Sequence, residues 1–397
     1  MRTLTFSKTG LNKLRTHQHE LKSSDVEEST KPIPPGDWCF FSHASLDEVW
    51  IGFVNPLIDE KFSSIQLLQL ISKTMVPSFD PLRFIEEKIL AAFKKRILFK
   101  GYEKGCRLIY GMNDDLPGLI VDSFHDLSII QINTAGLDKY REQIKSLINN
   151  ITHGSSIFLD NQKYREKEFL PTFPAEKVPP LKIEENGLSY SIRPEVLQKV
   201  GFYYDHRENR LQLKAILNRL NRKFITGVDL FSYAGAWGLN ALQAGVQNLD
   251  FVDQGDFEAE IKNNLISNGF SDRGQFFRSD VFKFIDDKIS KQEAYDVILC
   301  DPPAFAKSHL QKSQALDGYS KLHRKVLRMA NPGALVCFSS CTHYVTHEDF
   351  QNNIQDAAYK ENKQIQLIYS GIQGWDHPVS SLNDKSNYIK SYFYLTE

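Results

Sequence analysis

Strand candidates alternate with helices through the second half of the chain, and this alternation restricts the fold more than any other feature. The strand candidates are residues 226–231, 248–254, 274–280, 294–303 and 333–341, with helical stretches between them that include residues 256–268 and 313–330. Near-continuous apolar strands that alternate with helices are typical of a parallel, doubly wound α/β sheet. We therefore predict a Rossmann-like domain for residues 185–397.

Acidic side chains and one cysteine follow the ends of these strands. Ligands of doubly wound sheets bind at the carboxyl ends of the strands, where the sequence places Asp229, Asp253, Asp280, Asp301 and Cys341. Asp253 suits the two hydroxyls of a ribose, and Asp280 is placed to face an adenine amino group. Each acid alone is equally well explained as a helix cap, but an ordered series on successive strands favours a ligand site.

The segment DLFSYAGAWGLNAL, residues 229–242, predicts a strand, a glycine turn and a helix. Gly235 and Gly238 would let the backbone approach a ligand closely, because glycine lacks a Cβ atom. The GxGxxG fingerprint of dinucleotide sites is absent from this turn, which disfavours a pyrophosphate but not a nucleoside.

The most specific motif is YDVILCDPPAFAKS, residues 295–308. Pro302 and Pro303 donate no backbone hydrogen bonds, and they stiffen the turn that follows the strand. Such a turn can present Asp301 and main-chain carbonyls to a planar base, on which Phe305 could stack. The alternative interpretation is a rigid strand-to-helix turn with no ligand role.

Cys341 follows the last predicted strand, in the segment LVCFSSCTHYV, residues 335–345. A free cysteine at this point is either a packing residue or a nucleophile. Alternation along the preceding strand turns Cys300 away from the face that Asp301 uses, so we interpret Cys300 as a packing residue. Cys337 could share the face of Cys341 but lies deeper in its strand. Position alone leaves both interpretations of Cys341 open.

Taken in order, these motifs resemble those of class I S-adenosylmethionine (SAM)-dependent methyltransferases. KVGFYYDHRENR (residues 199–210) and DDLPGLIVDSF (residues 114–124) also resemble segments of the 23S ribosomal RNA large-subunit methyltransferase I family, which makes 5-methylcytosine. In that family, the strand after DPPxF ends in a Ser-Cys pair whose cysteine is the nucleophile, and here the pair is Ser340–Cys341. This chain departs from the family pattern at Ala304, where the family has lysine, and at Val200, where it has threonine.

The resemblance implies SAM as the cofactor and Cys341 and Asp301 as catalytic residues. Cys341 would add to C6 of cytosine and thereby make C5 nucleophilic, while Asp301 stabilises charge near N3. The implied substrate-binding residues are Pro302, Pro303 and Phe305, and no metal site is expected. The implied cofactor-binding residues come from the motifs above and are Tyr203, Asp205, Arg207, Phe231, Tyr233, Gly235, Asp253, Asp280 and Asp301.

Two further domains are expected before the Rossmann-like one. Short strand-like segments fill residues 1–78, and the resemblance implies a small PUA-like β domain there that binds RNA. Residues 79–184 predict a middle α+β domain, and residues 174–187 a linker. The first helix of the middle domain carries a basic face that consists of Arg83, Lys88, Lys94, Lys95 and Arg96. This face is either merely solvated or in contact with phosphates.

Composition excludes several classes of protein. The net charge of −1 gives no overall nucleic-acid signature, so RNA contacts would need a local basic patch. The five scattered cysteines fit neither a disulfide framework nor a metal-binding pattern. No secretory signal and no long apolar span are visible, so we expect a cytoplasmic protein without a membrane partner.

The leading hypothesis is a cytosine-C5 methyltransferase that acts on large-subunit ribosomal RNA, with a homodimer left open. One alternative is an RNA N-methyltransferase of the same fold, for instance one acting on guanine N2, because DPPxF also occurs in such enzymes. Another is a non-catalytic RNA-binding or ribosome-assembly factor, against which the presence of Asp253, Asp280 and Asp301 argues. Cys341 discriminates between the two enzymes, because N-methylation needs no thiol.

Overall fold

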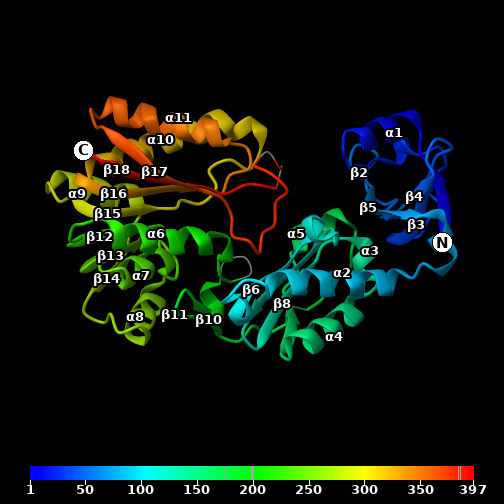
Figure 1. The fold of residues 1–397 in the computed structure, drawn as a ribbon, viewed down its shortest axis with the longest axis horizontal. Helices are drawn as coiled ribbons and strands as arrows, with labels where there is room; N and C mark the ends of the chain where they lie inside the picture. Colours follow the sequence, from blue (N-terminus) through cyan, green and yellow to red (C-terminus); the bar gives the residue numbers. More distant parts are fainter. Residues whose placement is uncertain (175, 198–200, 383, 385) are drawn as a thin grey trace. The chain divides into compact units, whose positions relative to one another are not determined.

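The structure is a computed structural model that describes residues 1–174, 176–197, 201–382, 384 and 386–397. The chain divides into two compact units, Met1–Val178 and Pro179–Glu397 (Figure 1). This division falls inside the segment 174–187, for which a linker was predicted. Residue 175 of that segment and residues 199–200 of the KVGFYYDHRENR segment lie outside the described residues.

The first unit contains two sheets. Its strands are β1 (Arg2–Thr5), β2 (Glu20–Leu21), β3 (Asp37–Ser42), β4 (Glu48–Val54), β5 (Ile65–Ser72), β6 (Gly105–Tyr110), β7 (Leu119–Phe124), β8 (Leu127–Ile132) and β9 (Ser155–Phe158). They form a five-stranded sheet of order β1-β3-β4-β5-β2 and a four-stranded sheet of order β6-β7-β8-β9. The helices are α1 (Lys8–Arg15), α2 (Pro81–Arg96), α3 (Ala135–Asp138), α4 (Arg141–Thr152) and α5 (Gln162–Lys167).

One hydrophobic cluster joins the two sheets of the first unit. Trp38 and Phe53 of the five-stranded sheet belong to the same buried cluster as Ile85 of α2 and Val121 of the four-stranded sheet. The indole nitrogen of Trp38 also donates to the main-chain oxygen of Gly136 at 3.0 Å. The segments on either side of residue 79 therefore share part of their cores.

The basic face of α2 differs from the sequence prediction at Arg96. This side chain is buried and forms a bidentate ion pair with Asp114, with nitrogen–oxygen distances of 2.9 and 2.6 Å. A buried guanidinium needs such a partner, because an unpaired charge is costly away from water. Lys94 and Lys95 are exposed, so they remain available for the phosphate contacts that the sequence suggested.

The second unit contains a two-stranded hairpin and a seven-stranded sheet. Its strands are β10 (Leu181–Glu185), β11 (Leu188–Ile192), β12 (Thr226–Leu230), β13 (Asn248–Asp253), β14 (Gly274–Arg278), β15 (Tyr295–Cys300), β16 (Ala330–Ser340), β17 (Ile365–Gly371) and β18 (Lys390–Thr396). Its helices are α6 (Arg207–Arg219), α7 (Ala236–Gln243), α8 (Glu258–Ser267), α9 (Val281–Ser290), α10 (Lys312–Arg328) and α11 (His347–Lys360). Figure 1 shows α7 and α8 on one side of the large sheet and α10 and α11 on the other.

This architecture confirms the predicted doubly wound α/β sheet, with one difference. The strand order is β14-β13-β12-β15-β16-β18-β17, and β12 to β16 are parallel. β18, however, pairs antiparallel with both β16 and β17, which makes the sheet mixed. Neither β17 nor β18 was predicted: polar residues interrupt the apolar run of β17, and the apolar run of β18 is confined to Tyr392–Leu395. Within the described ranges, no helix is both long and apolar enough to span a bilayer.

Candidate active site

A cavity of about 510 Å³ lies at the carboxyl ends of strands β12 to β16, entirely within the second unit. This volume is in the range of sites that bind small molecules and cofactors. Ten of the residues predicted from the sequence line it, namely Tyr203, Asp205, Phe231, Tyr233, Asp253, Asp280, Asp301, Pro302, Pro303 and Cys341. The rest of the lining was not predicted and consists of Phe202, His206, Arg210, Ser232, Ala236, Trp237, Gln254, Val281, Phe282, Ala304 and Lys307.

The loop after β12 has an unusual backbone. Phe231 and Tyr233 have φ angles of 64° and 46°, in the left-handed region that residues with side chains rarely adopt. Gly235 directly precedes α7 and has a φ of 80°, and a Cβ atom there would lie 2.7 Å from the side chain of Ile261. Backbone conformation and packing thus require this glycine, which does not line the cavity. Strained residues cluster at functional sites, so the conformations of Phe231 and Tyr233 are a signal that the sequence did not carry.

Main-chain amides hold the acids at one end of the cavity. Asp253 accepts hydrogen bonds from the amide of Tyr233 at 3.0 Å and from the amide of Gly255 at 2.9 Å, one on each carboxylate oxygen. Asp280 caps α9 by accepting from the amide of Lys283 at 3.0 Å. Because Asp280 also lines the cavity, the cap and ligand interpretations of this residue are compatible.

Asp229 is buried beneath this end and does not line the cavity. Its carboxyl accepts a hydrogen bond from the amide of Gly238 at 2.8 Å. Burial raises the pKa of Asp229 well above its ordinary value. Of the acids in the predicted series, Asp229 therefore supports the loop between β12 and α7 from below.

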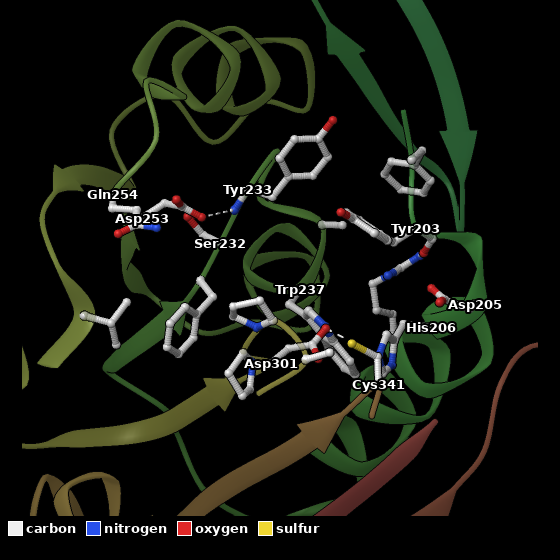
Figure 2. Close-up of a pocket in the computed structure, with 18 of the residues that line it drawn as sticks. Tyr203, Asp205, His206, Ser232, Tyr233, Trp237, Asp253, Gln254, Asp301 and Cys341 are labelled. Atoms are coloured by element: carbon white, nitrogen blue, oxygen red, sulfur yellow. Dashed lines mark hydrogen bonds and ion pairs between the residues drawn. The ribbon is translucent and has the colours of Figure 1, made fainter. Parts of the chain in front are cut away.

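Side chains from separate elements hold Asp301 at the other end. The indole nitrogen of Trp237 donates to Oδ2 of Asp301 at 3.1 Å, and Nε2 of His206 lies 3.4 Å from the same oxygen. Figure 2 shows these three residues and Cys341 gathered together, apart from Asp253 and its hydrogen bond. Burial lowers the pKa of His206, but the neighbouring Asp301 carboxylate outweighs this, and the net pKa lies above the ordinary value. Neither His206 nor Trp237 was predicted from the sequence, although they lie in KVGFYYDHRENR and DLFSYAGAWGLNAL, respectively.

Two predicted residues are engaged away from the cavity. Arg207 is buried with Nε 3.4 Å from Glu185, whereas Arg210, one helical turn further on, lines the cavity. Arg210 binds both oxygens of Glu185 at 2.6 and 2.7 Å and donates to the main-chain oxygen of Tyr203 at 2.9 Å. The ring of Phe305 stacks on the ring of Tyr319 in α10 and does not line the cavity.

The five cysteines, all within the described residues, differ in exposure. Cys341 is half-buried and lines the cavity, whereas Cys39, Cys106, Cys300 and Cys337 are buried. Burial raises the pKa of the Cys300 and Cys337 thiols, which favours the unreactive protonated form. The packing interpretation of Cys300 agrees with this burial.

Known proteins resemble this chain in sequence over much of its length. The family described as "Conserved hypothetical protein 95" matches residues 212–367. The ribosomal RNA large subunit methyltransferase I of Yersinia pseudotuberculosis is 31% identical over 296 residues, which cover 72% of this chain and 74% of that protein. The protein of the same name from Yersinia pestis matches to the same extent.

Solved structures share the whole fold at lower identity. A candidate SAM-dependent methyltransferase from Streptococcus mutans aligns over 100% of both chains, with a TM-score of 0.74 and 18% identity. A candidate methyltransferase in complex with SAH also aligns over 100% of both chains, with a TM-score of 0.76 and 18% identity. This likeness shows that the fold is that of SAM-dependent methyltransferases.

Proposed function

This chain belongs to the ribosomal RNA large subunit methyltransferase I family of SAM-dependent enzymes, and on that premise we propose that it methylates C5 of a cytosine in large-subunit ribosomal RNA through a covalent adduct with Cys341. One observation carries the proposal. Of the five cysteines, all of them described, Cys341 is the one that lines the cavity, and it does so together with Asp301. Methylation of a ring nitrogen or an amino group would need no thiol there.

The cavity fits the cofactor SAM. Asp253, oriented by two main-chain amides, would accept hydrogen bonds from the ribose hydroxyls, and Asp280 would accept one from the adenine amino group. Phe231 and Phe282 line the same space and provide apolar surface for a nucleoside. When bound, SAM supplies an activated methyl group.

Cys341 would act as the nucleophile on the base. A bond between its sulfur and C6 converts the C5–C6 double bond into an electron-rich centre at C5, which then takes up the methyl group. A base removes the C5 proton, the sulfur–C6 bond breaks, and the thiolate leaves as the aromatic ring is restored. The covalent step splits one difficult reaction into easier ones.

Asp301 would stabilise the base during thiolate addition. Electron density moves toward N3 of the ring as the sulfur–C6 bond forms. Asp301 would take up a proton when the base binds and donate it toward N3, which compensates this charge. Pro302 and Pro303, which line the cavity, would restrict the loop that carries Asp301. Trp237 and His206 support this role because they orient the carboxyl.

The first unit would contribute to RNA binding. We assign residues 1–78 to a PUA-like domain and residues 79–178 to a middle domain. The methyltransferase domain, expected from the sequence at residues 185–397, would begin at Pro179, because β10 (Leu181–Glu185) belongs to the second unit. The exposed Lys94 and Lys95 of α2 supply a basic surface for phosphates.

An RNA substrate with 5-fluorocytosine at the target position tests the covalent step. Fluorine cannot leave C5 as a cation, so the adduct should persist on a denaturing gel after methyl transfer. We expect an adduct with the wild type and with Cys337→Ala, and none with Cys341→Ala, which should also lose turnover while it still binds SAH. If Cys341→Ala methylated RNA at near wild-type rate, the covalent mechanism would be wrong and an N-methyltransferase would be favoured.

A further inference from the structure

The residues on either side of Cys341 are more buried than the cysteine itself. Ser340 and Thr342 are 0% and 1% exposed, whereas Cys341 is half-buried. The Tyr319 hydroxyl of α10 lies 2.9 Å from Oγ of Ser340 and 3.0 Å from Oγ1 of Thr342. One hydroxyl group thus holds both neighbours of the cysteine.

Tyr319 also connects this segment to the DPPAF loop. Its ring stacks on Phe305 with centroids 4.6 Å apart, and both rings belong to the core around α10. Since Phe305 is four residues after Asp301 in sequence, Tyr319 links the two loops that carry Asp301 and Cys341. This gives Phe305 a supporting position in place of the base-stacking role expected from the sequence.

Lys390 also holds the turn after the cysteine. It is the first residue of β18 and lies opposite Ser340 in the antiparallel pairing with β16. Its side chain is buried, and Nζ donates to the main-chain oxygens of Thr342 at 2.5 Å and Val345 at 2.8 Å. An ammonium group is thus fixed beneath the turn that begins at Cys341.

The charge of Lys390 is costly at this position. Burial lowers its pKa to about 8, and a Cys341 thiolate acts in the opposite direction by favouring the ammonium form. By the same coupling, the ammonium favours the thiolate. Tyr203 and Tyr319 also sense the charge of Cys341.

The other charged or titratable groups that couple to Lys390 come from α11. The Asp349 carboxylate favours the ammonium, and Lys390 in turn disfavours protonation of His347. Because the folded pKa of Lys390 lies below its ordinary value, the unfolded chain binds more protons above about pH 8, and stability rises with pH in that window. At neutral pH the buried ammonium therefore costs stability, as expected for a group kept for a role at the site.

We propose that Lys390 and Tyr319 are positioning residues for Cys341, with Lys390 fixing the turn after the cysteine and favouring its thiolate, and Tyr319 fixing the residues on either side. This inference rests on the proposed function, in which Cys341 is the nucleophile. The two residues have separable effects, because only Lys390 brings a charge.

Alkylation of Cys341 by iodoacetamide across a pH series, followed by mass spectrometry of the peptide, measures the Lys390 effect without any methylation. We expect Lys390→Met to raise the midpoint of the pH profile and to slow alkylation at pH 7 about threefold to tenfold, because only the thiolate reacts. Lys390→Arg should retain most of the wild-type reactivity. Lys363→Met is the matched control, since Lys363 donates to the main-chain oxygen of Ala330 at the opposite end of β16.

Tyr319→Phe removes the hydroxyl and adds no charge. We expect it to leave the alkylation midpoint unchanged while kcat falls about tenfold and KM for RNA changes little. SAH binding and thermal unfolding of each variant show whether the domain remains folded. If Lys390→Met kept the wild-type profile in a folded protein, or if Tyr319→Phe kept wild-type kcat, the corresponding positioning role would be wrong.

The outcomes separate this inference from the proposed function. Methylation by Cys341→Ala would overturn the nucleophile assignment, whatever the Lys390 variants do. An unchanged alkylation profile in Lys390→Met, together with an inactive Cys341→Ala, would overturn the role of Lys390 and leave the covalent mechanism in place.

Discussion

The two ends of the cavity are built in different ways. At one end, the carboxylate of Asp253 is held by the main-chain amides of Tyr233 and Gly255. At the other end, Asp301 is held by the side chains of Trp237 and His206, which come from distant parts of the chain. A main-chain N–H is present whatever residue other than proline occupies the position, whereas a side-chain contact depends on residue identity. The Asp301 end should therefore be far more sensitive to substitution of its neighbours.

The same contrast applies to the groups that surround Cys341. The side chains of Tyr319 and Lys390 hold residues 340–345. Tyr319 belongs to helix α10, and Lys390 belongs to strand β18 of the large sheet. A site with such supports can be disturbed without a change in the reacting groups. Three substitutions test whether the two ends differ in this way.

The largest effect is expected for Asp301→Ala. It removes the carboxyl proposed to compensate charge at N3, and loss of one such stabilising group costs about a hundredfold to a thousandfold in kcat. Single-turnover methylation with RNA measures this loss, and SAH binding measured by calorimetry should change less than about tenfold. A variant that lost SAH binding and kept single-turnover chemistry at saturating SAM would reverse the assignment of the two ends.

Asp253→Ala should have the opposite signature. Loss of charge-assisted hydrogen bonds to the ribose costs roughly 1.5–3 kcal/mol, or about tenfold to a hundredfold and more in the dissociation constant of SAH. Adduct formation at saturating SAM should persist, because Cys341 and Asp301 are intact. Asp250→Ala serves as the control, since Asp250 lies on the same strand but binds the hydroxyl of Tyr295 outside the cavity lining. Equal weakening in both variants would contradict a ribose role for Asp253.

The smallest effect is expected at His206. His206→Leu removes a group whose Nε2 lies 3.4 Å from the Asp301 carboxylate and should lower kcat about tenfold, the order expected for one polar contact to a charged group. His206→Gln keeps an N–H donor and should retain most of the activity. Equal losses in both variants would show that the donor geometry is not what matters.

The raised pKa of His206 adds a pH signature to this comparison. The stabilising interaction of the imidazolium with Asp301 is fully present below the ordinary histidine pKa and is lost as the pH rises through the raised value. Thermal unfolding of the wild type should therefore show a fall in stability across that window, and His206→Gln should lack this component. An unchanged pH profile in His206→Gln would contradict the ion pair.

Features that depend on neighbouring residues could be predicted from the sequence. The strands β12 to β16 follow from apolar runs, and the acids at their ends follow from the order of the motifs. Features that depend on partners far along the chain could not. Arg96 was assigned to an exposed face, but Asp114 draws it into the core. Phe305 was expected to stack on a base, but it stacks on Tyr319.

The sequence by itself determined the fold class, the family and the candidate site residues, because strand periodicity, turn residues and motif order are local properties of the chain. Tertiary structure decided which of the five cysteines reaches the cavity and what surrounds it. The antiparallel insertion of β18 brings Lys390 opposite Ser340, although fifty residues separate them in sequence. Burial, charge coupling and hydrogen bonding between such distant residues arise only when the strands pair, so a chemically ordinary cysteine and lysine become a coupled pair through folding.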